Sequence, residues 1–331
     1  MGVIVASAPA RANLIGNPSD QYGGATLACT VPLRARVRIA PADETRLATA
    51  GETVVIEKEA DLALCGDLFD LARAVLAHGG APLPRAAIAY ESEVPLRSGL
   101  AGSTALLVAL LRALLAFRGE EPGTPHVLAE RARDVERRRL GVTCGYVDHY
   151  MTVFGGCRYV DFRGKTPEAA FGAEPFATVE TIDAPLPFVL AFTGKQHSSD
   201  SVHRPIRARW LAGEAPVVRA MERMGELGLA GKSALLRGDL AELARLMNEN
   251  HVRIREIGGS GEPNERLIAA ALGAGAPAAK LAGAGDGGTI VALWPHADAA
   301  PLERALRAAG AAALYRPRPE PGVTVAGDGV D

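Results

Sequence analysis

The 331-residue sequence lacks an excess of either charge and has few cysteines. Its Lys and Arg residues nearly balance its Asp and Glu residues, for a formal net charge of −2. Neither nucleic acid nor an anionic membrane is therefore expected as a partner. The four cysteines are widely spaced, form no CxxC pair and show no zinc-binding spacing, which favours free thiols in a reducing cytoplasm.

Long uncharged apolar runs are also missing. No stretch approaches the roughly 18 apolar residues of a transmembrane helix. Residues 1–16 lack a basic segment ahead of their short apolar run, so a secretory signal is not expected either. We predict a cytoplasmic protein, monomer or homodimer, that acts on a small molecule. The length and the hydrophobic content of 48% allow two domains with a substantial core.

The periodicity of apolar residues predicts a mixture of strands and helices. Strands occur as neighbours and helices as pairs without strict alternation, which favours the α+β class over a doubly wound parallel sheet. A proline-bearing passage near residue 183 suggests an N-terminal domain over 1–183 and a C-terminal domain over 184–331. The predicted strands are 25–40, 86–90, 157–162, 188–194, 289–294 and 322–326, and the predicted helices are 105–117, 126–139, 214–227, 232–237, 240–256, 264–272 and 300–313.

Two glycine-rich segments imitate nucleotide-binding motifs. Residues 283–288, GAGDGG, fit GxGxxG, but a helix-like stretch precedes them and a strand follows, the reverse of the dinucleotide-binding order. Residues 225–233, GELGLAGKS, have one residue too many for a Walker A loop. We interpret the second segment as a capped turn between two helices.

A soft loop, PLRSGLAGSTA at 95–105, directly precedes a strongly apolar helix. Ser103 or Thr104 suits an ordinary helix N-cap. Anion binding is the alternative, because the first amides of a helix are unpaired and glycines let a phosphate approach the backbone. The loop alone does not decide between the two.

Four segments that follow one another along the chain favour anion binding by the loop, because together they resemble a known family. They are SAPARANLIGNPSDQYGG at 7–24, PLRSGLAGSTA at 95–105, ERRRLGVTCGYVDHYMTVFGG at 136–156 and KLAGAGDGG at 280–288. Together they resemble the GHMP family of small-molecule kinases. The resemblance implies a two-domain α+β fold with the active site in the cleft between the domains.

The resemblance also implies ATP and Mg²⁺ as the cofactors. Gly102 and Thr104 depart from the family's usual loop residues but keep small side chains. Ser103 and Glu136 match the family's magnesium ligands, and two hard oxygen donors suit that ion. Without the resemblance, a solvated charge in a basic run is the favoured interpretation of Glu136. The implied ATP-binding residues are Pro95, Gly99, Leu100, Ala101, Gly102, Ser103, Thr104, Gly283 and Gly285.

Asp148 matches the family's catalytic acid, twelve residues after Glu136. A carboxylate there can accept the proton of a substrate hydroxyl as phosphoryl transfer proceeds. Arg11 matches a basic residue that stabilises the transferring phosphoryl group. The alternatives are a helix N-cap for Asp148 and a surface ion pair for Arg11.

The acceptor is indicated by residues 17–20, NPSD, which resemble the glucuronokinase branch of the family. The resemblance implies phosphorylation of the anomeric hydroxyl of glucuronate or a related sugar. An Asx turn is the structural alternative for NPSD. Heptose or another sugar, mevalonate, and an inactive binding protein remain alternative functions. The substrate-binding residues that we predict are Asn17, Asp20, Tyr22, Gly145, His197 and Arg207.

Overall fold

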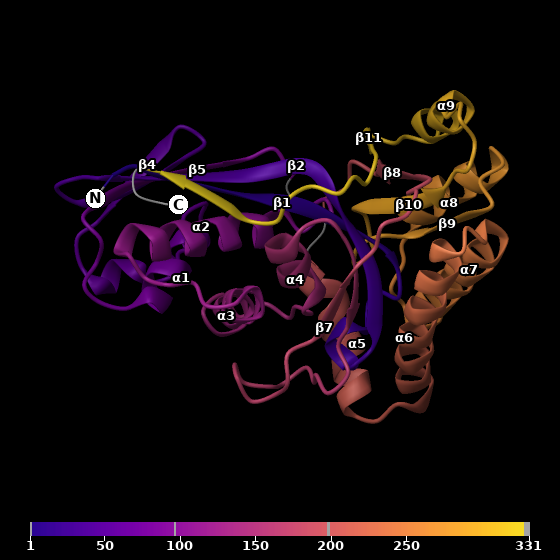
Figure 1. The fold of residues 1–331 in the computed structure, drawn as a ribbon, viewed down its shortest axis with the longest axis horizontal. Helices are drawn as coiled ribbons and strands as arrows, with labels where there is room; N and C mark the ends of the chain where they lie inside the picture. The colour runs from indigo at the N-terminus through magenta and orange to yellow at the C-terminus, as the bar shows by residue number, and fades with distance from the viewer. Residues whose placement is uncertain (1, 96, 197–198, 328–331) are drawn as a thin grey trace.

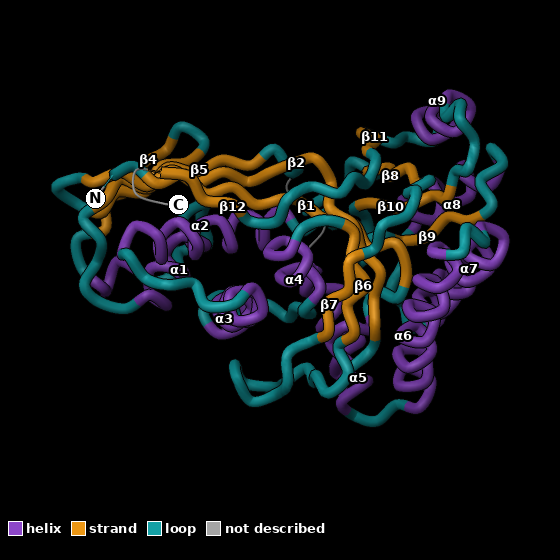
Figure 2. The backbone as a smooth tube through the Cα atoms, viewed as in Figure 1, coloured by secondary structure: helices purple, strands orange, loops and turns teal. Residues whose placement is uncertain are grey.

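The computed structural model describes residues 2–95, 97–196 and 199–327, and His197 lies outside them. Two β-sheets and the helices packed against them make up the described chain (Figure 1, Figure 2). Every strand pairing in them is antiparallel except that of β3 with β5. This mixture confirms the α+β class.

The first sheet has the order β12-β1-β2-β5-β3-β4, with β6 pairing β2 and β7 pairing β6. The α-helices α1 to α4 cover one face of it, and their apolar side chains meet the sheet in a continuous core (Figure 1). The elements are β1 (Ile4–Ile15), η1 (Ser19–Tyr22), β2 (Ala25–Pro41), β3 (Thr45–Thr49), β4 (Glu52–Ile56), η2 (Glu59–Leu62), α1 (Asp70–Gly79), β5 (Ala86–Ser92), α2 (Gly102–Arg118), α3 (Pro125–Arg138), α4 (Val147–Phe154), β6 (Cys157–Asp161), β7 (Thr178–Thr181) and β12 (Thr324–Gly327).

The second sheet has the order β11-β8-β10-β9. Its strands β8 and β10 contribute side chains to two cores, one shared with α8 and α9 and one shared with the first sheet. The elements are β8 (Phe188–Phe192), α5 (Ser199–Leu211), α6 (Ala215–Leu236), α7 (Leu240–Glu256), α8 (Glu262–Gly273), β9 (Ala278–Leu281), β10 (Thr289–Leu293), α9 (Ala300–Ala308) and β11 (Ala313–Tyr315).

Strand β1 is absent from the sequence-based prediction. Its sequence alternates apolar and mostly polar residues from Ala6 to Leu14, but alanine holds most of the apolar positions and Pro9 lies among them, and both residue types are depleted in strands. Ten of its twelve residues are buried between β2, β12 and the helices. The register with β2 shifts between Pro9 and Ala10, which lets the strand accommodate the proline. The first motif therefore lies largely in a central strand.

Helix α6 corrects the predicted turn within residues 225–233. The helix is continuous across this segment, and its glycines face the first sheet. A β-carbon on Gly228 would lie 2.1 Å from the carbonyl oxygen of Ala25, and one on Gly225 would lie 2.9 Å from the Cα atom of Gly24. These glycines allow close helix–sheet packing; they do not end a helix.

We expect Gly228→Ala to destabilise the protein. Overpacking costs about 1–3 kcal/mol, and the better helix propensity of alanine offsets at most about 1 kcal/mol of it. Gly273→Ala is the control, because a β-carbon there meets nothing within 4 Å. Urea unfolding should show a loss for the first variant and no loss for the second. Equal stability of the two variants would contradict the packing explanation.

The C-terminal segment returns to the first sheet. Helix α9 ends at Ala308, five residues before the predicted end, and β11 follows it. Strand β12 then pairs with β1, in register from Ile4↔Gly327 to Ser7↔Thr324 (Figure 1). A boundary near residue 183 stays a prediction, and the chain after it contributes this strand to the N-terminal sheet.

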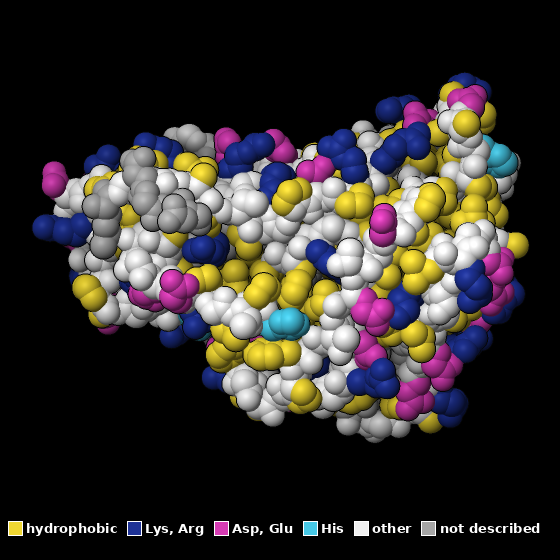
Figure 3. Space-filling view, viewed as in Figure 1, with side chains coloured by type: hydrophobic (Ala, Val, Ile, Leu, Met, Phe, Trp, Pro, Cys, Tyr) yellow, Lys and Arg dark blue, Asp and Glu magenta, His cyan; other side chains and the backbone are white. Residues whose placement is uncertain are grey.

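The surface agrees with the balanced composition. Positive and negative side chains are interspersed over the visible face (Figure 3). Within the described residues, no helix combines the length and apolar character needed to cross a bilayer.

Candidate active site

Arg11 joins the predicted catalytic acid to the predicted phosphate loop. From β1, its Nε and Nη2 atoms donate to Asp148 Oδ1 at 2.8 and 2.5 Å. Its Nη1 atom donates to the carbonyl oxygen of Gly99 at 2.8 Å. The Arg11 side chain is 6% exposed, whereas that of Asp148 is 29% exposed. The pair is therefore anchored on the arginine side and accessible on the carboxylate side.

Asp148 lies in the first turn of α4, where Tyr146 is the N-cap residue. Both bonds from Arg11 fall on Oδ1, and no described residue donates a hydrogen bond to Oδ2. The second oxygen therefore remains available to a substrate hydroxyl. This placement differs from the helix N-cap considered as an alternative.

The loop before α2 presents an uncapped helix N-terminus. Ala101, with φ of 60°, is the N-cap residue, and no side chain caps the helix. The N-cap considered as the alternative for Ser103 or Thr104 is not observed: Ser103 is exposed, and Thr104 donates to Glu136 Oε2 at 3.2 Å. Free amides and the positive end of the helix dipole suit a phosphate.

The third motif packs directly on this loop. A β-carbon on Gly283 would lie 3.0 Å from the Cα atom of Gly99. Thr289 Oγ1 donates to the carbonyl oxygen of Ser98 at 2.8 Å, a contact that the sequence did not suggest. Gly285 has φ of +113°, and a β-carbon there would lie 1.9 Å from the carbonyl oxygen of Gly259. Gly283 thus lets the third motif approach the phosphate loop, and Gly285 lets it pack against Gly259 in its own half of the chain.

Asp286, in the third motif, carries a negative charge that is paired with a lysine. Its carboxylate accepts a hydrogen bond from Lys195 Nζ at 2.6 Å, so the charge is paired. The residue has φ of 55°, a conformation that aspartate tolerates better than most residues.

Asp20 anchors the catalytic helix. Its Oδ2 atom accepts hydrogen bonds from the backbone N–H groups of Tyr146, at 2.7 Å, and Val147, at 3.0 Å. Burial raises the pKa of Asp20, these two hydrogen bonds oppose the rise, and the nearby charge of Asp148 adds to it. Gly145 is a glycine for the same reason, since a β-carbon there would lie 1.9 Å from Asp20 Oδ2.

Asn17 belongs to a buried polar network between the two sheets. Its Oδ1 atom accepts a hydrogen bond from Lys280 Nζ at 2.6 Å, and its backbone oxygen accepts one from Asn250 Nδ2 at 3.1 Å. Lys280 is fully buried, and burial lowers its pKa to about 7. Asn17 therefore holds the segment before η1 in place, and a direct sugar contact stays a prediction.

Arg207 lines a basic pocket, and Tyr22, which is close enough to feel the charge of Arg207, is not part of its lining. Tyr22 stacks at a tilt on Trp210 with ring centroids 5.0 Å apart. Burial raises the pKa of Tyr22, Asp20 adds to this rise, and Arg207 opposes it. The pocket has a volume of about 370 Å³, and its lining includes Arg137, Arg204, Arg207 and one acid, Glu168, which pairs with Arg207.

Glu136 lies inside the protein on α3. It is 6% exposed, accepts the hydrogen bond from Thr104, and has His149 Nε2 2.7 Å from its Oε2 atom. Sequence reasoning missed Thr104 and His149 as partners of Glu136; the position of His149 directly after Asp148 was the only available signal. The Thr104 bond ties the start of α2 to Glu136, so the Glu136 carboxylate lies next to the phosphate loop.

Comparison with known proteins shows the family of the chain. Residues 67–156 match the GHMP kinases N terminal domain, and residues 232–312 match the GHMP kinases C terminal domain. Glucuronokinase 1 of Arabidopsis thaliana is 28% identical over 87% of this chain and 84% of its own. Mevalonate kinase of Pyrococcus horikoshii is 28% identical over 88% and 89%.

A solved structure shares the fold. Galactokinase of Lactococcus lactis, complexed with galactose, superposes with a TM-score of 0.81 over 97% of this chain and 95% of its own, at 17% identity. The likeness covers both sheets and their helices. With both family domains in order along it, the chain belongs to the GHMP kinase family and is an ATP-dependent small-molecule kinase.

Proposed function

We propose that the protein transfers the γ-phosphoryl group of ATP to the anomeric hydroxyl of glucuronate or a closely related sugar, giving a sugar 1-phosphate. The main support for phosphoryl transfer is Arg11, which donates two hydrogen bonds to Asp148 Oδ1 and one to the Gly99 carbonyl oxygen. It thereby links the candidate base to the phosphate loop. The similarity to a plant glucuronokinase supports the choice of acceptor. The similarity to a mevalonate kinase makes mevalonate the second candidate.

In this mechanism Asp148 Oδ2 accepts the proton of the anomeric hydroxyl. The sugar oxygen bonds to the γ-phosphorus, the bond from that phosphorus to the bridging oxygen breaks, and ADP leaves. Arg11 holds Asp148 in position and places positive charge beside the phosphate loop. The first amides of α2 bind phosphate oxygens. A magnesium ion held by Ser103 and Glu136 would neutralise phosphate charge.

The magnesium ligands have a direct test. Ser103→Ala combined with Glu136→Gln should raise the Mg²⁺ concentration for half-maximal rate by at least about tenfold, a loss typical even of outer partners of a metal. A magnesium titration at saturating sugar measures it. Ser233→Ala combined with Glu226→Gln, on α6, is the control and should leave the titration unchanged. The same titration curve for both double variants would refute the ligand assignment.

The acceptor is tested by comparing sugars. Glucuronate should exceed glucose in kcat/KM by at least about tenfold, which one charge-assisted contact worth about 1.4 kcal/mol supplies. The basic pocket suggests Arg207 as the partner of the carboxylate, because its lining carries three arginines against one acid. Arg207→Gln should reduce the preference for glucuronate more than it slows glucose.

Arg209→Gln is the matched control. Arg209 lies on the same helix, α5, but pairs with Glu214 at 2.6 Å and does not line the pocket. It should leave the ratio of the two sugars unchanged. Equal use of glucose and glucuronate, or sole use of mevalonate or a heptose, would defeat the acceptor assignment.

A further inference from the structure

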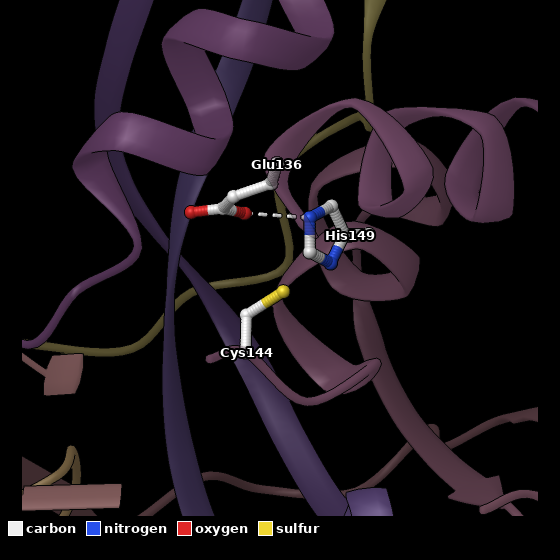
Figure 4. Close-up of side chains that lie close together, drawn as sticks. All are labelled: Glu136, Cys144 and His149. Carbon is white, nitrogen blue, oxygen red and sulfur yellow. Dashed lines mark ion pairs between the residues drawn. The ribbon is translucent and has the colours of Figure 1, made fainter. Parts of the chain in front are cut away.

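We propose that Glu136, Cys144 and His149 form a binding site for a zinc ion. One ligand atom from each residue, an oxygen, a sulfur and a nitrogen, lies within 4.8 Å of the other two. Figure 4 shows the three side chains directed toward one another from α3, the loop before α4, and α4 itself. The cysteine spacing in the sequence gave no sign of this cluster, because its three ligands are of different types.

The donor set is one that zinc uses. Zinc binds cysteine sulfur at about 2.3 Å, histidine nitrogen at about 2.0–2.1 Å and carboxylate oxygen at about 2.0–2.2 Å. His149 Nε2 and Glu136 Oε2 are 2.7 Å apart. Two such atoms on one tetrahedral ion are about 3.3 Å apart, so they need to separate by roughly half an ångström. Three protein ligands leave the fourth position to water.

His149 provides the independent indication of a ligand. Its side chain is fully buried, and among the described residues neither ring nitrogen has a hydrogen-bond partner. The short approach of Nε2 to Glu136 therefore lacks the direction of a hydrogen bond. Buried polar atoms in native proteins are nearly always satisfied, so two ring nitrogens without a hydrogen bond, one of them 2.7 Å from a carboxylate oxygen, support an ion bound at this position.

Cys144 would bind zinc through its sulfur atom as the thiolate. A coordinating thiol is deprotonated by the metal, so its proton passes to solvent as the zinc–sulfur bond forms. No oxidant or other reactant is needed.

The site has a consequence for catalysis that depends on the proposed function. Glu136 is also the proposed magnesium ligand, so a zinc ion that takes this carboxylate removes it from the magnesium site. Zinc should therefore inhibit the kinase. Zinc binding itself does not depend on the kinase mechanism.

Cobalt(II) tests the site by spectroscopy on the full chain after removal of metals. One equivalent should produce the charge-transfer absorption of a cobalt–thiolate bond, and zinc should abolish it by displacement. Cys144→Ser should lose this absorption, and His149→Gln should weaken cobalt binding at least tenfold. Cys65→Ser is the control, because Cys65 is an exposed thiol outside the cluster.

Each result bears on the proposal. No absorption in the unaltered protein, or absorption that persists in Cys144→Ser, overturns the zinc site. Circular dichroism checks that each variant folds, and the histidine variant provides the test if the cysteine variant does not fold. Absorption that appears as expected while zinc fails to inhibit confirms the zinc site and instead argues against Glu136 as a magnesium ligand.

Discussion

Asp148→Asn should lower kcat by roughly 10²–10⁴, the usual contribution of a positioned general base. The amide keeps the shape of the side chain but has no carboxylate Oδ2 to accept the acceptor's proton. Arg11 retains an oxygen partner, so the phosphate loop contact at Gly99 should persist. ATP affinity should therefore change little. Steady-state rates and ATP binding by calorimetry measure the two effects separately.

Asp134→Asn is the matched control. Asp134 pairs with Arg138 within α3 at 2.8 Å and has no contact with Arg11 or Asp148. Its variant should retain nearly full activity. Turnover of Asp148→Asn within a factor of about three of the unaltered enzyme would mean that Asp148 is not the base, since its loss should cost far more.

The sequence predicted elements with a clear apolar period and failed where packing overrides local pattern. β2 and α7 match their predicted ranges within one residue, because alternation and helical periodicity are strong there. β1 was missed because alanines carry most of its alternation and Pro9 lies within it, and both residue types are depleted in strands. α6 was divided in two because glycines that admit a neighbouring strand look like breakers in a single sequence.

In the candidate site, too, the sequence predicted some features and missed others. Residue types and their order indicated the family, but a single sequence does not contain the partner of each side chain. Asn17 and Asp20 were predicted as sugar ligands from the resemblance of residues 17–20 to glucuronokinase. In the structure, Asn17 bonds Lys280 and Asp20 bonds the start of α4, which are contacts across 263 and 126 positions of the chain. Such distant pairs leave no local signal.

The contact of Asp20 with α4 predicts a second large loss of activity, in a variant of Gly145. Gly145→Ala should lower kcat by about 10²-fold, because its β-carbon would overlap Asp20 Oδ2 and displace the first turn of α4, where Asp148 lies. A misplacement of about 1 Å is enough for a loss of that size. ATP binding should be preserved, since the phosphate loop belongs to α2. Initial rates at saturating ATP and sugar provide the measurement.

A double-mutant cycle identifies the cause. Asp20→Ala removes the carboxylate that Gly145 accommodates, so adding Gly145→Ala to it should cost less than in the unaltered enzyme. The two residues are in contact, and such pairs show interaction energies of about 0.5–3 kcal/mol. Thermal unfolding of all three variants separates a displaced helix from general loss of structure. If Gly145→Ala lowers kcat equally with and without the Asp20 carboxylate, this carboxylate does not position α4. Its predicted role as a sugar ligand would then be the remaining explanation for Asp20.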